Sequence, residues 1–259
     1  MRDINFLKNN NVNVDQSLEL FGDIETYNET LLEFQKSLGQ KLQEIDTYYK
    51  LGDMPNYAIY VHSLKSDCKY FGFITLADIA YQHELQSKAN NYSFVKENYA
   101  ALVTEANKVK QIVDAYLDES EETLDEVETE VLDEDIILVA DDSEVIRAFV
   151  KKIFDANYEL AFAGDGEEAL NIIKSHIEDG KIKAILLDLN MPKVDGFAVL
   201  DFLKENGLLS KMPVTIISGD SSSDAINKAF TYEIVDMINK PFNEAKIKDV
   251  VERTINKSN

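Results

Sequence analysis

The most constraining feature of this sequence is a dense acidic block in its middle. The 18 residues from Asp118 to Asp135 contain 11 acidic residues and no basic one, in a chain of 259 residues with a formal net charge of −22. Like charges at this density repel one another and do not pack into a core. We therefore expect three parts: an N-terminal domain over residues 1–117, a linker over 118–135 and a C-terminal domain over 136–259.

The acidic block leaves two linker conformations open. Leu117, Leu124, Val127 and Val131 keep a helical stripe, so the last helix of the first domain could continue into the linker. The adjacent carboxylates favour an extended or frayed chain instead. We expect helix at the start and flexibility before Asp135. A flexible linker would allow the two domains of one chain to meet, and a stiff helix would prevent it.

Composition argues against several functional classes. The net charge of −22 makes nucleic acid and anionic membrane poor partners. No apolar run approaches the ~20 residues that span a bilayer, and the N-terminus has no apolar signal-peptide core. The single cysteine, Cys68, has no internal disulfide partner. We expect a soluble, cytoplasmic protein with no nucleic-acid partner and no membrane partner.

The first 117 residues have the spacing of helices and no strand pattern. Apolar residues recur in steps of three and four over residues 24–49 and 95–116. Breaks at Gly52 and Gly72 separate these segments from the helices between them. Four substantial helices and a short leading helix, Val14–Phe21, predict an up-down helical bundle.

One predicted helix, from about Pro55 to Phe71, carries a histidine away from its apolar stripe. The stripe consists of Tyr57, Val61, Leu64, Cys68 and Phe71. On a wheel of 100° per residue, His62 lies roughly 140° from the centre of the stripe and is expected to face solvent. Its neighbours on that face are small or basic: Ala58, Lys65, Ser66 and Lys69. A solvent-facing histidine alone is weak support for a function.

The residues around this histidine add a family resemblance. His62-x-Leu-Lys65, with Gly72 ten residues after the histidine, resembles the signature of histidine phosphotransfer (HPt) domains over roughly residues 12–117. The resemblance implies that His62 is phosphorylated and that Lys65 is its supporting cation. Ser66 departs from the family, which usually has glycine there, but serine is small enough that we expect docking of a partner to survive.

After residue 135 the pattern changes to short apolar runs alternating with amphipathic segments. The predicted strands are Ile136–Ala140, Tyr158–Ala163, Ala184–Leu187, Val214–Ile217 and Met237–Asn239. The predicted helices lie near residues 143–154, 167–177, 197–205, 223–232 and 244–255. Five such units predict a five-stranded, doubly wound parallel sheet, so the whole chain is expected to combine an α domain with an α/β domain.

Polar residues follow these strands where each one ends. Asp141 and Asp142 follow the first, Asp188 the third, and Lys240 the fifth, while Ser218 follows the fourth. The carboxyl ends of parallel strands share one edge of the sheet, and crowded carboxylates need a cation. Their hard oxygens suit Mg²⁺. Asp188 would then attack a phosphoryl group as nucleophile, with Lys240 offsetting its charge and Ser218 contacting its oxygens.

The same residues give the second resemblance, to response-regulator receiver domains with a flavodoxin-like sheet. The matching elements are Asp141-Asp142, Asp188-x-x-x-Pro192, Gly196, Ser218 and Lys240-Pro241, within about residues 135–257. The resemblance implies that the backbone carbonyl of Asn190 also binds Mg²⁺. Met237 departs from the family, because many receivers have at this position a Tyr or Phe that changes rotamer on activation.

Together these features predict a phosphorelay protein that carries phosphoryl groups on His62 and Asp188 and has no kinase, sensor or DNA-binding output domain. Its partners would be a histidine kinase or the receiver of a hybrid kinase, and a downstream receiver or effector. It would be no enzyme beyond its own phosphorylation and dephosphorylation. One alternative is a receiver-gated regulator or phosphate sink. Another is a Mg²⁺-dependent phosphohydrolase of small substrates, against which the missing second catalytic carboxylate counts.

Overall fold

The structure is a computed structural model that describes residues 3–117, 135–219 and 223–258. The chain divides into two compact units, Met1–Val127 and Glu128–Asn259, and each is considered by itself. Residues 118–134 of the predicted linker lie outside the described residues, and only Asp135 is described. The conformation of the linker therefore stays a prediction. Among the described residues, no helix combines the length and apolar character needed to cross a membrane.

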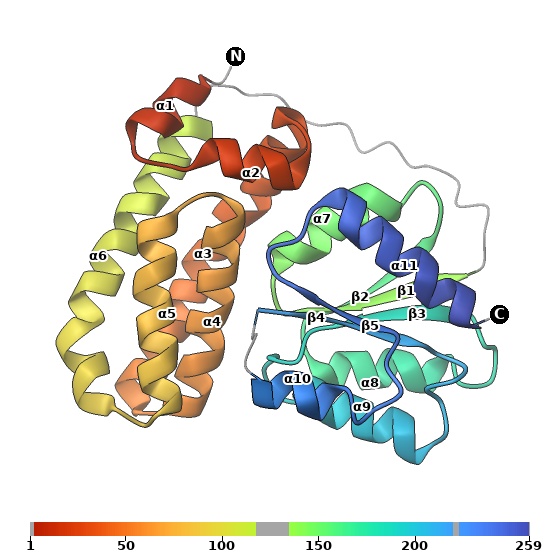
Figure 1. Ribbon diagram of the computed structural model, residues 1–259. Coiled ribbons are helices and arrows are strands. Elements are labelled where there is room, and N and C mark those ends of the chain that lie inside the picture. Colours follow the sequence, from red (N-terminus) through yellow and green to blue (C-terminus); the bar gives the residue numbers. More distant parts are fainter. Residues whose placement is uncertain (1–2, 118–134, 220–222, 259) are drawn as a thin grey trace. The chain divides into compact units, whose positions relative to one another are not determined.

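The first unit is helical throughout its described part. Its helices are α1 (Ile4–Asn9), α2 (Val14–Phe21), α3 (Ile24–Leu51), α4 (Met54–Tyr70), α5 (Ile74–Lys88) and α6 (Tyr92–Leu117). The four long helices lie side by side, with α3 and α5 each packed against both α4 and α6, and the short α1 and α2 lie at one end (Figure 1). The predicted helical organisation is confirmed, although α1 was not predicted because its six residues bury only Leu7.

The turn between α3 and α4 explains where these helices end. Gly52 adopts a left-handed conformation (φ 69°) that closes α3, and the Asp53 carboxylate accepts a hydrogen bond from Asn56 N at the start of α4. Pro55 lies in the first turn of α4, where backbone N–H groups have no acceptor within the helix. Proline, which has no N–H, therefore loses no hydrogen bond there. These caps fix the start of α4, the helix that carries His62.

The other end of α4 is anchored by Phe71 in an aromatic core. Its ring centroid lies 5.1 Å from that of Phe34, 5.4 Å from Phe21 and 5.6 Å from Tyr27, and all four side chains are fully buried. Rings at these separations are in favourable contact and exclude water. With both of its ends held, α4 has a defined rotation about its axis.

Gly72 permits the N-terminal segment to pack against the end of α4. Its φ of 75° is one that L-residues rarely adopt, and an added Cβ would lie 2.5 Å from the carbonyl oxygen of Asn13. Asn13 N also donates a hydrogen bond to Gly72 O at 2.9 Å. The glycine ten residues after His62 therefore has a structural role in this fold.

We expect Gly72→Ala to destabilise the helical unit by about 1–2 kcal/mol from the left-handed backbone alone, with the clash at Asn13 adding to this. Gly39→Ala is the matched control, because Gly39 lies inside α3 with nothing within 4 Å of an added Cβ. That control should gain about 0.5–1 kcal/mol. Urea unfolding of both variants measures the difference, and a Gly72→Ala protein as stable as the wild type would contradict the prediction.

The second unit is a five-stranded parallel sheet covered by helices on both faces. The strands are β1 (Ile136–Ala140), β2 (Glu159–Ala163), β3 (Ile182–Leu187), β4 (Val214–Ser218) and β5 (Asp236–Asn239), in the order β2-β1-β3-β4-β5. The helices are α7 (Glu144–Phe154), α8 (Gly166–Ser175), α9 (Gly196–Glu205), α10 (Ser223–Ala229) and α11 (Glu244–Ser258). Figure 1 shows α7 and α11 on one face and α8, α9 and α10 on the other.

The predicted doubly wound sheet is confirmed, and no strand end differs by more than two residues from the expected one. Strands β1 and β4, which each have a neighbour on both sides, are buried along their whole length, whereas every residue of the edge strand β2 except the last is at least partly exposed. All pairs of neighbouring strands are parallel, so their carboxyl ends lie along one edge of the sheet.

Candidate functional site

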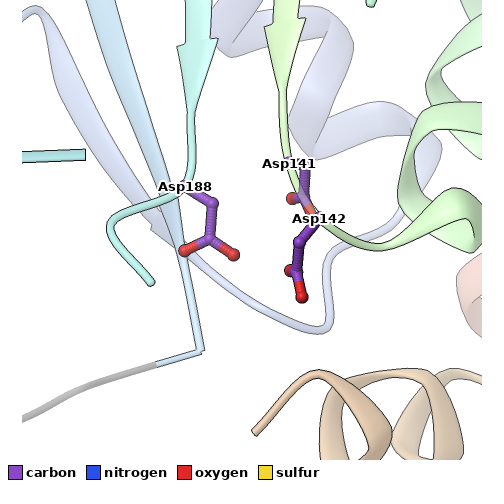
Figure 2. Close-up of side chains that lie close together, drawn as sticks. All are labelled: Asp141, Asp142 and Asp188. Atoms are coloured by element: carbon purple, nitrogen blue, oxygen red, sulfur yellow. The ribbon is translucent and has the colours of Figure 1, made fainter. Parts of the chain in front are cut away.

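Three carboxylates meet at the carboxyl edge of the two central strands. Asp141 and Asp142 directly follow β1, and Asp188 directly follows β3 (Figure 2). The strand pairing continues to this point, because Asp188 N donates to Ala140 O at 2.8 Å. Carboxylate oxygens of the three residues lie within 4.8 Å of one another, and Asp141 and Asp188 are fully buried. The fold thus concentrates negative charge at one point of the edge.

Lys240 supplies the opposite charge. Its ammonium lies 2.6 Å from Asp141 Oδ2 and 2.5 Å from Asp188 Oδ2. Backbone pairing with the end of β4 positions it, since Lys240 N donates to Ser218 O at 2.8 Å. The structure therefore brings Asp141, Asp142, Asp188, Ser218 and Lys240 to the same edge, as the strand pattern predicts.

The loop after β3 is held tightly against Asp188. Asn190 N donates to Asp188 Oδ1 at 3.0 Å, and Gly196 N donates to Leu189 O at 3.1 Å. A Cβ on Gly196 would lie 2.2 Å from the carbonyl oxygen of Asp188, so a side chain there would displace the loop. This close approach is a physical reason for glycine eight residues after the aspartate, and it keeps Asn190 beside the carboxylates.

The electrostatics of this edge fit a divalent cation. Burial raises the pKa of Asp141 to about 7, and Asp188 and Asp142 add to this rise against the opposing charge of Lys240. Burial disfavours the charge on Lys240, but the three carboxylates outweigh it and raise the pKa of Lys240. Three carboxylates facing one ammonium leave an excess of negative charge, and hard oxygen ligands in this number suit Mg²⁺.

A second polar cluster lies between α4 and α5 in the helical unit. His62 Nδ1 is 2.7 Å from Glu84 Oε1 and 3.1 Å from Lys65 Nζ, and Lys65 Nζ donates to Glu84 Oε2 at 2.7 Å. Lys88 Nζ, one turn beyond Glu84 on α5, donates to Glu84 Oε1 at 2.8 Å. Burial alone would raise the pKa of Glu84, but the hydrogen bond with His62 and the charges of His62, Lys65 and Lys88 lower it.

Comparison with known proteins identifies the second unit. The family model for the response regulator receiver domain matches residues 137–252. The probable methanogenesis regulatory protein FilR2 of Methanothrix harundinacea is 30% identical over 125 residues, which cover 45% of this chain and 79% of that protein. This chain belongs to the response-regulator receiver family. The two-component response regulator ORR5 of rice is 27% identical over 120 residues, 46% of this chain and 87% of that protein.

These similarities concern the receiver, and the family model leaves the helical unit unmatched. The receiver domain of the Francisella response regulator 1452 is 28% identical and covers 48% of this chain and 99% of that chain, with a TM-score of 0.43. The chain spans 50% of the probable C4-dicarboxylate response regulator DctR of Priestia megaterium and 30% of a protein-glutamate methylesterase of Pseudomonas aeruginosa.

The raised pKa of Asp141 predicts that the metal-free receiver loses stability as the pH rises. An unfolded aspartate ionises near pH 4, whereas the pKa of folded Asp141 is raised to about 7. The folded state thus favours the protonated carboxyl, so this contribution to stability is fully present below about pH 4 and is lost as the pH rises through about 7. The loss is of the order of a few kcal/mol.

Thermal unfolding in EDTA at several pH values tests this. The Tm of the wild type should fall between about pH 5 and pH 8, and Asp141→Asn, which cannot ionise, should remove most of that fall. Equal slopes for the two proteins would show that Asp141 is already ionised in the metal-free receiver.

The expectation that the His62 imidazole is free on an open face is wrong within the helical unit itself: its Nδ1 lies 2.7 Å from Glu84 Oε1 of α5 and 3.1 Å from Lys65 Nζ. Over the two units taken together, its side chain is 1% exposed. The helical wheel shows correctly that His62 points away from the apolar stripe of α4, but α5 packs closely against α4 and carries Glu84 to the imidazole. Lys65 and Ser66, expected on the same open face, are 3% and 4% exposed. His62 Nε2 has no hydrogen-bond partner among the described residues.

Glu84 was not predicted as a site residue. It lies on α5, 22 positions after His62, and its contact with the histidine depends on how two helices pack. In the sequence, Glu84 lies four residues after Ala80, in a segment whose apolar residues include Leu76 and Ile79. A glutamate in that position also fits an ordinary solvated residue. Glu84 also engages Lys65, so the Lys65 charge lies on the Nδ1 side of the imidazole.

Met237, in place of the usual receiver aromatic, lies on β5 and packs half-buried against the sheet core. A methionine side chain can fill this space in several rotamers without a polar tip to satisfy. An activation switch based on an aromatic ring at this position is therefore not available to this receiver.

Proposed function

We propose that this chain is a phosphorelay protein in which Asp188 and His62 each carry a phosphoryl group. The observation that supports it most is the buried Asp188 carboxylate, at the end of a central strand and in contact with Lys240, beside Asp141 and Asp142. Receiver domains interact with histidine kinases or phosphotransfer proteins. The partners of this chain would be a histidine kinase or hybrid-kinase receiver upstream, and a receiver or effector downstream.

The carboxylate cluster would hold Mg²⁺ through Asp141, Asp142 and Asp188, with the Asn190 carbonyl as a further ligand. When bound, the ion would supply positive charge next to the oxygens of the phosphoryl group that is being transferred. Lys240 adds a fixed ammonium at the same edge, where its contacts with Asp141 and Asp188 already orient it. Asp188 would attack phosphorus through a carboxylate oxygen, while the bond from phosphorus to the donor's nitrogen or oxygen breaks and that atom leaves with the electron pair. Ser218, at the end of β4, would contact the attached group.

The helical unit would supply the histidine half of the relay. Glu84 can accept the Nδ1–H proton of His62, which leaves the lone pair on Nε2 as the nucleophile. Transfer forms the phosphorus–Nε2 bond and breaks the bond between phosphorus and the donor carboxylate oxygen, which leaves with the electron pair. The Nδ1 proton stays in the hydrogen bond to Glu84, whose charge offsets the positive charge on the phosphorylated imidazole.

Intact-mass spectrometry of the full chain after incubation with acetyl phosphate and Mg²⁺ tests this proposal. The wild type should gain up to two phosphoryl groups, one alkali-labile on Asp188 and one acid-labile on His62. His62→Gln should lose only the acid-labile group, and Asp188→Asn should lose both, because His62 receives its group from a receiver. A wild-type chain that never carries the acid-labile group, or steady release of phosphate from phosphorylated metabolites, would overturn it.

A further inference from the structure

Ser66, one helical turn after His62, presents a buried hydroxyl that no described residue pairs with. Its Oγ atom makes no hydrogen bond within the described part of the chain, and the residue is 4% exposed. His62 Nε2, also on α4, is likewise buried and has no hydrogen-bond partner among residues 3–117, 135–219 and 223–258. A buried polar atom without a hydrogen-bond partner is unfavourable, so the Ser66 hydroxyl and the Nε2 lone pair, one turn apart, indicate a place for a polar ligand.

The orientation of the Ser66 hydroxyl differs from that of comparable residues in the same unit. Thr30, Thr47, Ser87 and Thr104 each donate to the carbonyl four residues earlier in their own helix, at 2.7 to 2.8 Å. This bond satisfies a hydroxyl locally and is open to any helical serine. Ser66 does not make it, so its hydroxyl remains available to a group outside the helix backbone.

Helix geometry places this hydroxyl beside the imidazole. Residues four apart lie on the same face, about 5–6 Å between Cβ atoms, and the later side chain leans toward the N-terminus and thus toward the earlier one. Lys65, the cation expected to support the phosphoryl group, is bound to Glu84 and lies beside Nδ1. Nε2 is at the opposite side of the ring, so a donor is needed there that Lys65 in this position does not supply.

We propose that Ser66 Oγ donates a hydrogen bond to the phosphoryl group on Nε2 of His62 and favours that form over the phosphoaspartate; this inference rests on the proposed function. A phosphoryl group offers three anionic acceptor oxygens, and hydrogen bonds to anions are stronger than neutral ones. The hydroxyl keeps its proton, and no bond to Ser66 forms. Serine here, where the resembled family has glycine, thus adds a specific donor to the site.

The test is the equilibrium ratio of phospho-His62 to phospho-Asp188 in the full chain. After loading with acetyl phosphate and Mg²⁺ and rapid desalting, the acid-labile and alkali-labile groups are followed until their ratio is constant. An equilibrium ratio does not depend on whether exchange occurs within or between chains, or on how fast a variant docks. Ser66→Ala should lower the ratio about tenfold, equivalent to about 1.4 kcal/mol, and Ser66→Thr, which keeps the hydroxyl, should stay within about threefold of wild type.

Ser93→Ala, at an exposed position of α6, is the control and should leave the ratio unchanged. An unchanged ratio in Ser66→Ala, or an equal fall in Ser66→Ala and Ser66→Thr, would overturn the hydrogen bond while leaving the relay intact. A wild-type chain without phospho-His62 would instead overturn the proposed function and this inference with it, so the two failures are distinguishable.

Discussion

Phosphorylation of Asp188 by acetyl phosphate should fall by at least about a hundredfold when EDTA removes divalent cations. The acceptor carboxylate lies within 4.8 Å of those of Asp141 and Asp142, and the Lys240 ammonium contacts the carboxylates of Asp141 and Asp188. A phosphoryl donor brings further negative charge to this edge. A metal ion contributes several kcal/mol of charge stabilisation in such a transfer, and about 2.7 kcal/mol corresponds to a hundredfold in rate.

The measurement is the rate of mass gain with Mg²⁺ and with EDTA. Asp188→Asn should not be labelled under either condition, whereas Glu252→Gln, which removes an exposed carboxylate on α11, should behave as the wild type. Undiminished labelling in EDTA would show that Lys240 alone is sufficient, and labelling of Asp188→Asn would place the acceptor elsewhere.

Replacing Glu84 by alanine should slow transfer to His62 by about tenfold to a hundredfold, as happens when the partner that orients a metal-binding histidine is removed. Glu84 holds Nδ1 at 2.7 Å and is the partner of Lys65, whose pKa is lowered by burial. Its loss leaves the imidazole free to adopt the wrong tautomer and Lys65 without its counter-charge. Glu84→Gln keeps a hydrogen-bond acceptor for Nδ1–H, so its rate should fall between those of the wild type and Glu84→Ala.

Lys88→Ala is the matched control for Glu84. Lys88 also contacts the Glu84 carboxylate, but its side chain is 42% exposed, so its removal should change stability by no more than about 1 kcal/mol and leave transfer nearly unchanged. Single-turnover transfer from a phosphorylated receiver measures the rates, and urea unfolding separates them from loss of fold. Wild-type transfer in a folded Glu84→Ala protein would remove Glu84 from the site.

Both halves of the fold follow from local patterns in the sequence. Steps of three and four residues predict the long helices of the first unit, and short apolar runs such as Ile136–Ala140 predict the strands of the second. These patterns are readable because each element buries a face whose period its own backbone sets. Element ends were less predictable: β3 begins at Ile182 rather than Ala184, because Ile182 pairs with Ile136 across the sheet.

The carboxylate cluster could also be predicted from the sequence. Asp141 and Asp188 each follow an apolar run directly, and the carboxyl ends of parallel strands meet at one edge whatever the details of packing. Sequence order and strand direction therefore suffice to bring these residues together. Their charges, burial and contact with Lys240 then follow from that position.

Tertiary structure alone decided the environment of His62. A helical wheel gives the direction of a side chain from its own helix, but it contains no information about which neighbouring helix covers that face or what it carries. The packing of α5 against α4 brings Glu84 to Nδ1 and pairs it with Lys65, while Nε2 and the Ser66 hydroxyl have no partner in the part of the chain that the structure describes. Contacts between residues 22 positions apart on different helices depend on the register of two packed surfaces, which no single helix determines.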